Sequence, residues 1–180
     1  MTLSFDITFN GPFRIGAGAP INGYDAPVDR TNPLPSTSLK GLMRAEASER
    51  LGLPTELVAR VFGSKHHECP WVWSDATLTS PRFGPSTKVR VDDDGHAMRG
   101  FLRFGEQVWA ASGSFTVEQR LHIPAEELGR HRTVLFAAAA SITALGESRL
   151  RGSGWVVVRG RDAQPDLPAE LFKLVRAVAS

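Results

Sequence analysis

The stretch "GYDAPVDRTNPLPSTSLKGLMR", residues 23–44, joins a polar loop to the start of a helix. Its first half is rich in Pro, Asn, Asp and Gly, which favour turns. In its second half, the hydroxyls of Ser36–Ser38 can cap the first free amides of a helix. The charged residues around this loop include Asp25, Arg30, Lys40 and Arg44. The stretch therefore predicts a long connection that ends in a helix and gathers charge in one place.

On either side of this stretch, the hydrophobic pattern predicts alternating strands and helices. Residues 3–9 alternate apolar and polar side chains, as a half-buried strand does. An apolar stripe from Leu39 to Leu51 predicts a helix that ends at Gly52. The other elements are expected as a helix at 55–62, a strand at 72–78, a possible hairpin within 80–105, a strand from Phe115 to Ile123, a helix from Thr133 to Leu145, a strand at 155–158 and a helix at 168–178.

This order of elements predicts an α+β, ferredoxin-like fold. Strand, helix, strand, insertion, strand, helix, strand is the split βαβ pattern, in which helices cover one face of an antiparallel sheet. The other face is left for a ligand, and many RNA-binding modules use that face. Residues 1–180 are expected to form one domain, with a small hairpin insertion within 80–114.

Composition limits the class of protein and its compartment. The net charge is only +2, but 17 of the 21 basic residues are Arg, whose planar fork binds phosphate bidentately. A GC-rich genome explains the same bias, so composition permits a nucleic-acid partner without requiring one. Cys69 is the only cysteine, which excludes internal disulfides. Without a signal-peptide pattern or a long apolar run, a cytoplasmic protein with no membrane span is expected.

Two glycine-rich segments are candidate phosphate contacts. Gly16-Ala17-Gly18 follows Arg14 but lacks the third glycine of a dinucleotide-binding motif. The segment "GESRLRGSGWV", residues 146–156, combines glycines that allow close backbone approach with flanking positive charge. Its candidate residues are Arg149, Arg151, Gly152 and Gly154. By itself the first segment is more simply an ordinary turn, and the second could equally be a solvated Gly/Arg turn.

The predicted helix start offers a third candidate. Ser38 lies where free amides attract phosphate, and Lys40 and Arg44 share one helix face at i and i+4. A surface helix with two cations is the alternative. Asp25 is most simply an Asx-turn residue. His66, His67 and Cys69 lack a second ligand pair at metal-binding spacing, so no structural zinc is expected.

Taken in order, six segments make the chain resemble the RAMP superfamily of CRISPR effector proteins. They are "FRIGAG", "YDAPVDR", "LPSTSLKGLMRAEA", "VFGS", "WSDA" and "LGESRLRGSGWV". The chain is most similar to the backbone subunit of type III complexes, from Phe13 to Val157. The helix start and the last glycine-rich loop are the most specific pair. The chain departs from the family pattern at Glu147, where glycine is usual, and at Trp155, where Arg is frequent.

The resemblance implies an RNA-recognition-type fold that polymerises along a guide RNA (crRNA) and uses a hairpin thumb to kink the duplex formed with the target RNA. Other copies of the chain and other effector subunits are the expected protein partners. The implied RNA-binding residues are Arg14, Gly16, Gly18, Arg30, Ser38, Lys40, Arg44, Arg149, Arg151, Gly152 and Gly154. Possible thumb contacts are Arg82, Lys88, Arg90, Arg99 and Arg103.

The resemblance also implies that Asp25 of "YDAPV" matches the aspartate needed to cut target RNA, with a divalent cation, Mg²⁺ by preference. RNA carries its own nucleophile, the 2′-hydroxyl, so the protein need only align it and stabilise charge. A carboxylate with a pKa of about 3.9 is a poor base at neutral pH, which favours a positioning or cation-holding role. Two alternatives stay open: a structural guide-binding subunit without nuclease activity, and a guide-processing nuclease, which would need a histidine near the glycine loop.

Overall fold

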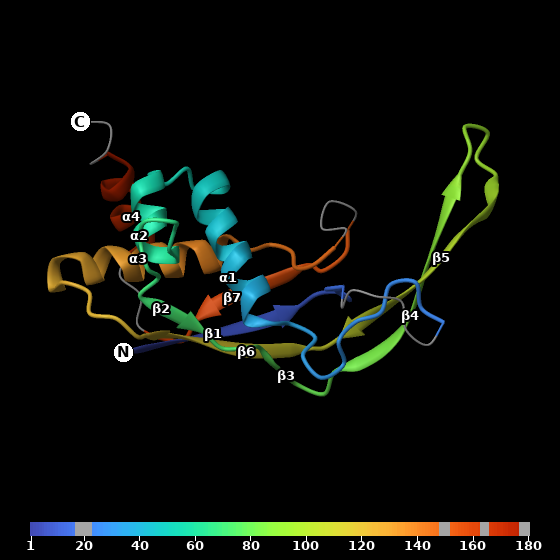
Figure 1. The fold of residues 1–180 in the computed structure, drawn as a ribbon, viewed down its shortest axis with the longest axis horizontal. Coiled ribbons are helices and arrows are strands. Elements are labelled where there is room, and N and C mark those ends of the chain that lie inside the picture. The colour runs from blue at the N-terminus through green and yellow to red at the C-terminus, as the bar shows by residue number, and fades with distance from the viewer. Residues whose placement is uncertain (17–22, 148–151, 163–165, 177–180) are drawn as a thin grey trace.

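The computed structural model describes residues 1–16, 23–147, 152–162 and 166–176, which form a helix-covered sheet with a long projecting hairpin (Figure 1). The elements follow one another as β1 (Thr2–Phe9), α1 (Ser36–Ala45), a π-helical turn (Glu46–Arg50), α2 (Thr55–Phe62), β2 (Trp71–Trp73), β3 (Thr77–Leu78), β4 (Arg82–Val91), β5 (Ala97–Trp109), β6 (Ser112–Gln119), α3 (Ala125–Ser141), β7 (Val156–Gly160) and α4 (Leu167–Arg176). No helix in these ranges is long and apolar enough to cross a membrane.

The main sheet is antiparallel and has the order β2-β6-β1-β7, with β3 also paired to β6. β1 is therefore central: Phe5 lies opposite Phe115 of β6, and Ile7 lies opposite Val158 of β7. The predicted α+β class and one-sided helix layer are confirmed, because α1, α2 and α3 lie on one face of this sheet (Figure 1).

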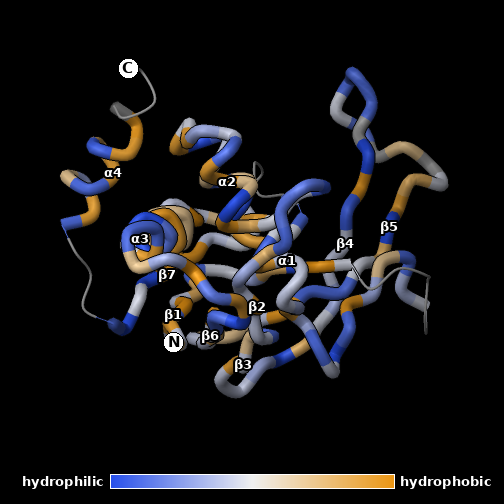
Figure 2. Tube along the Cα trace, turned by 60° about the vertical axis from the view of Figure 1, so that its left-hand side comes forward, coloured by the Kyte–Doolittle hydropathy of each residue, from blue (hydrophilic) through white to orange (hydrophobic). Residues whose placement is uncertain are grey.

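The core lies between the sheet and the helices, where hydrophobic residues of β1, β7 and α3 come together (Figure 2). Phe5 is fully buried and packs between two other rings, with centroid distances of 5.0 Å to Phe115 and 5.4 Å to Phe136. Offset and tilted ring pairs at this separation add to the stabilisation from burial. The opposite face of the sheet carries Ser4, Asp6 and Thr8 of β1 together with the exposed side chains of Val72 and Val157.

The single strand expected at 72–78 is two short strands, β2 and β3, and the predicted boundaries of α3 and β6 are wrong. Helix α3 begins at Ala125 rather than Thr133 and ends at Ser141 rather than Leu145. Its first turns are charged and contain Gly129, so the apolar run revealed only the buried half of the helix. Strand β6 ends at Gln119, before Leu121 and Ile123, because the chain turns there and Leu121 donates its amide to Pro70.

The cap of α1 also differs from the prediction. No hydroxyl of Ser36–Ser38 caps the helix; instead, Oδ1 of Asp75 accepts a hydrogen bond from the Ser36 amide at 2.7 Å. This bond and hydrogen bonds from Asn32 and the Ser36 side chain hold the pKa of Asp75 below its usual value. The helix start is therefore fixed by a residue from the β2–β3 connection.

Strands β4 and β5 form a separate two-stranded sheet that projects from the body (Figure 1). The strands pair from Arg82 opposite Trp109 to Val91 opposite Ala97, with an irregularity after Val89. Gly95 adopts a positive φ of 83° at the tip, as a tight turn requires. The hairpin lies within the region 80–114 in which an insertion was expected, and its role as an RNA-contacting thumb stays a prediction.

Candidate nucleic-acid interface

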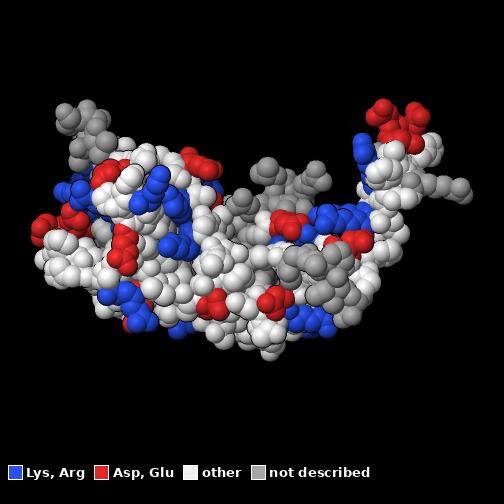
Figure 3. Space-filling view, in the orientation of Figure 1, with Lys and Arg blue, Asp and Glu red and all other residues white. Residues whose placement is uncertain are grey.

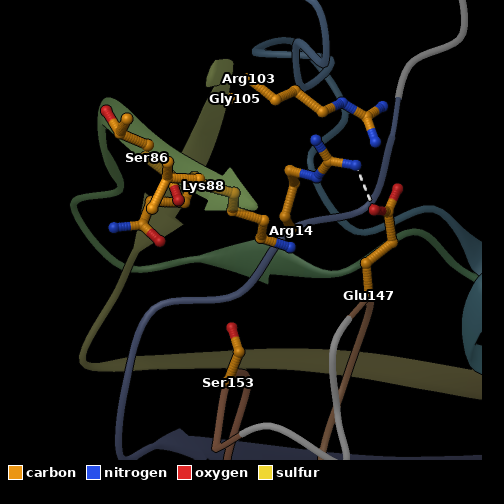
Figure 4. Close-up of a pocket in the computed structure, with 10 residues that line it drawn as sticks. Arg14, Ser86, Lys88, Arg103, Gly105, Glu147 and Ser153 are labelled. Carbon is orange, nitrogen blue, oxygen red and sulfur yellow. Dashed lines mark hydrogen bonds and ion pairs between the residues drawn. The ribbon is translucent and has the colours of Figure 1, made fainter. Parts of the chain in front are cut away.

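A cleft of about 380 Å³ lies where the hairpin leaves the body (Figure 4). Lys and Arg side chains gather at this junction on the face seen in Figure 3. The lining residues come from the N-terminal loop, both hairpin strands and the loop after α3: Arg14, Ser86, Thr87, Lys88, Val89, Arg103, Gly105, Gln107, Glu147 and Ser153. The cleft therefore unites residues that are distant in the sequence.

Backbone hydrogen bonds join the two loops that form the floor of the cleft. The Glu147 amide donates to the Arg14 carbonyl at 2.8 Å, and the Gly154 amide donates to the Pro12 carbonyl at 2.8 Å. Gly146 and Gly154 have positive φ, and a Cβ on either would collide with a neighbouring carbonyl. These two glycines therefore serve the packing of the loops on each other. A Cβ on Gly152 would meet nothing within 4 Å.

Arg14 lies at the centre of the cleft. Its Nη1 donates to the Ala26 carbonyl at 3.2 Å, and its Nη2 forms an ion pair with Glu147 (Figure 4). The hydrogen bond from Arg14 is the main reason why the pKa of Glu147 lies below its usual value, and the nearby charges of Lys88 and Arg103 act in the same direction. Glu147 therefore stays ionised at neutral pH.

Lys88 and Arg103 lie directly opposite each other on β4 and β5. Both side chains reach into the cleft beside Arg14 (Figure 4). Like charges in directly opposed positions on a hairpin repel each other. With Arg14, they make three cations against the single carboxylate of Glu147, so the cleft favours an anionic ligand.

Asp25 lies at the base of the hairpin and is exposed. Its amide donates to the Phe104 carbonyl at 2.9 Å, and its Oδ2 accepts from the Phe104 amide at 2.9 Å. The expected Asx turn is therefore wrong: the carboxylate bonds to β5, 79 residues further along the chain. No group of three His, Cys, Asp or Glu side chains that could hold a metal ion occurs in the described parts of the chain.

Arg30 lies on the other side of the hairpin base. Its Nε donates to Oε1 of Glu106 at 2.9 Å, and its guanidinium lies 5.6 Å from the centre of the Phe83 ring. Glu106 is buried and also accepts from the Val28 amide at 3.3 Å. Glu106 was not predicted from the sequence. Its only signal was a charged residue within an alternating strand, and its partners lie more than 70 residues away.

The start of α1 adjoins the glycine loops, but its two cations do not. A second cleft, of about 330 Å³, is lined by residues of α1 and of both loops, among them Gly16, Ser38, Gly41 and Gly146. At 100° per residue, Lys40 and Arg44 point away from the helix face that carries Ser38. Lys40 instead lies 5.3 Å from the centre of the Trp73 ring.

Several other predicted residues have separate surroundings. Arg90 lies 5.5 Å from the centre of the Phe101 ring on the hairpin, and Arg82 lies opposite Trp109 at its base. His67 is 3.1 Å from Glu56, and the Cys69 thiol contacts backbone carbonyls. Gly18, Arg149, Arg151 and the side chain of Arg99 lie outside the described residues.

The fold is similar to that of chains in a CRISPR complex. One similar chain belongs to an apo-state cryo-EM structure of type III-B Cmr-beta, with a TM-score of 0.70 and 11% sequence identity over 93% of this chain and 98% of that one. Another belongs to type III-B Cmr-beta bound to cognate target RNA, with a TM-score of 0.70 and 12% identity over 89% and 97%. At this identity the likeness concerns the fold. No family model and no curated protein matches the sequence.

Proposed function

We propose that this chain is a guide-RNA-binding backbone subunit of a type III-like CRISPR effector complex, with a ferredoxin-like body and the β4–β5 hairpin as its thumb. The strand order supports this fold. Helices α1 and α2 connect β1 to β2, and β6 lies between these two strands in the sheet. Helix α3 connects β6 to β7, and β1 lies between these two. Such interleaving is the split βαβ arrangement.

The observation that carries the proposal is the cationic cleft at the root of the projecting hairpin. Arg14 from the body and Lys88 and Arg103 from the hairpin converge there beside the glycine loops. A sugar–phosphate chain is a repeated anion that this arrangement can hold without reading sequence. Similarity to chains of a complex described as bound to cognate target RNA supports the same function.

The proposed activity is cleavage of target RNA paired to the guide, with Asp25 as the positioning residue. Its carboxylate is exposed at the hairpin base, where a thumb would bend the duplex. Bending a nucleotide out of the helix brings its 2′-hydroxyl in line with the adjacent phosphorus. Attack would leave a 2′,3′-cyclic phosphate and a 5′-hydroxyl, so a target with a 2′-deoxy nucleotide at the cut position should resist cleavage there.

The expected Mg²⁺ does not fit a binding site made of protein side chains alone. In the ranges that the structure describes, no cluster of three acidic, His or Cys side chains surrounds Asp25. Mg²⁺ is commonly held by one or two carboxylates together with phosphates and water. An ion here would therefore take most of its ligands from RNA, and it would supply charge neutralisation.

The alternative function is a structural guide-binding subunit without nuclease activity. It is favoured by the hydrogen bond between Oδ2 of Asp25 and the Phe104 amide, because this bond by itself gives Asp25 a role in holding the hairpin. A guide-processing nuclease is less well supported, since no histidine is among the residues that line either cleft.

Two substitutions of Asp25 separate these functions. Asp25→Asn keeps an oxygen that can accept from the Phe104 amide and removes the charge, whereas Asp25→Ala removes both. In the assembled complex with labelled target RNA and Mg²⁺, we expect wild type to give regularly spaced products. Asp25→Asn should bind target normally and cut at least 100-fold more slowly, about the size of effect that one catalytic group supplies.

The outcomes differ between the two functions. If Asp25→Asn cuts like wild type while Asp25→Ala loses target binding, Asp25 is structural and its proposed role in cleavage is wrong. If wild type binds target RNA and gives no products, the nuclease proposal is wrong and the structural alternative holds. Failure of the chain to form a regular assembly with a crRNA and partner subunits would overturn both functions.

A further inference from the structure

Glu147 is an acidic residue in a cleft that otherwise favours anions. Its carboxylate pairs with Arg14, and its own amide is bonded to the Arg14 carbonyl, so side chain and backbone are tied to the same residue. Gly16 provides the space for this pair, because a Cβ there would approach Oε1 of Glu147 to 3.0 Å. The carboxylate thus lies where an anionic ligand of Arg14 would lie.

The two partners of this ion pair differ in exposure. The Arg14 side chain is 12% exposed, whereas that of Glu147 is 47% exposed. Arg14 is held in place by its bond to the Ala26 carbonyl, and its buried Nε has no acceptor among the residues that the structure describes. The arginine is therefore fixed with donor capacity remaining, while the glutamate can leave towards solvent.

We propose that Glu147 is a built-in competitor for RNA phosphate. In the RNA-free chain its carboxylate occupies the anion position at Arg14, and a phosphate of the guide backbone takes that position when the guide binds. This inference rests on the proposed guide-binding function and adds a residue that limits it. The bound phosphate is shared between Arg14 and the opposed cations Lys88 and Arg103.

The exchange makes the cleft selective for a polyanion. A single small anion that displaces Glu147 gains one ion pair with Arg14 but is repelled by the displaced carboxylate, which stays nearby. Its net binding free energy is therefore small. A phosphodiester chain also places neighbouring phosphates near Lys88 and Arg103, which Glu147 does not neutralise completely. The cleft can thereby discriminate against free phosphate and other small anions.

The test is the substitution Glu147→Gln, which keeps the shape of the side chain and removes its charge. We expect the full-length variant to bind a labelled single-stranded guide RNA about two- to fivefold more tightly than wild type at low salt, as the removal of one exposed charge interaction predicts. Its log K against log salt should be steeper by about 0.7, because one more positive charge is available to neutralise phosphate.

Glu68→Gln is the matched control. Glu68 is exposed on the loop between α2 and β2 and does not line this cleft, so equal loss of charge there should change neither affinity nor slope. Thermal unfolding of Glu147→Gln should resemble that of wild type, which excludes a folding defect.

Four results would overturn the inference. Weaker binding by Glu147→Gln would mean that the ion pair only braces the loops. Equal gains in Glu147→Gln and Glu68→Gln would reflect overall charge rather than competition at Arg14. If wild type binds RNA and Glu147→Gln is unchanged, the competitor role alone is wrong; if wild type and all variants bind no guide, the proposed function fails with it.

Discussion

The body and the hairpin of this protein are held in place by different forces. In the body, apolar side chains of β1, β6 and α3 are buried against one another, with Phe5, Phe115 and Phe136 at the centre. The hairpin exposes several large apolar side chains, including Phe101 and Leu102, and forms a separate sheet. Polar bonds at its base join it to the loop at residues 23–30.

This difference indicates that the body supplies most of the stability of the fold, whereas the hairpin and its base supply the candidate binding surface. Burial of apolar surface stabilises the body and is independent of any one charge. The base of the hairpin is joined to the body by backbone hydrogen bonds to Phe13, Asp25 and Ala26 and by the burial of Val108 in the core, with side-chain bonds to Asp25 and Glu106 in addition. The part of the hairpin beyond this base has few contacts with the core. The following four predictions test this division, from the largest effect to the smallest.

The same substitution in the two regions should have very different effects. Phe5→Ala removes a fully buried ring, and we expect a loss of about 3–5 kcal/mol in the free energy of unfolding. Phe101→Ala on the hairpin removes a ring that is 48% exposed and contacts Arg90, so a loss below about 1 kcal/mol is expected. Urea denaturation measures both. Similar losses would show that the hairpin and body share one core.

Glu106→Gln should loosen the hairpin base. The carboxylate is buried and accepts bonds from Val28 and Arg30, so weakening these bonds should cost about 1–3 kcal/mol. Hydrogen exchange should become faster at the Val28 amide and in β5 while β1 stays protected. Glu118→Gln, at an exposed ion pair with Arg120, is the control and should leave exchange unchanged. Uniform acceleration across the sheet would contradict separate stabilisation.

Cations of the cleft should contribute more to RNA binding than those of α1. Lys88→Ala and Arg103→Ala should each weaken binding of a single-stranded guide and flatten the salt slope by about 0.7, with little change in thermal stability. Lys40→Ala and Arg44→Ala were also expected from the sequence to weaken binding, but their helix face points away from the glycine loops. Equal slope changes for both pairs would extend the RNA path over α1.

Asp75 should make a small, pH-dependent contribution to the body. Its pKa is lowered in the folded chain, so its stabilising effect is present above the unfolded pKa of about 3.9 and is lost as pH falls through the folded pKa. Asp75→Asn can still accept from the Ser36 amide, but it should lose less stability than wild type between pH 6 and pH 3. An identical decrease in both proteins would assign the acid sensitivity to other carboxylates.

Local patterns predicted much of the body, whereas the candidate site depended on distant contacts. The alternation in β1 and the stripes of α1 and α2 placed these elements closely, because backbone hydrogen bonding and burial follow a short period. Asp25, Arg14 and the hairpin cations were selected from the sequence, but their contacts were not. The bond from Asp25 to Phe104 spans 79 residues, and the Arg14–Glu147 pair spans 133.

The sequence by itself determined the order of strands and helices, the glycines at the turns and the residues that carry charge. Tertiary structure alone decided what those charged residues contact. Glu147 forms an ion pair with Arg14, Glu106 forms one with Arg30, and Lys40 lies over the ring of Trp73. The physical reason is range. A repeating pattern acts through neighbours a few residues apart, whereas an ion pair between two loops exists only after the sheet and the hairpin have brought those loops together.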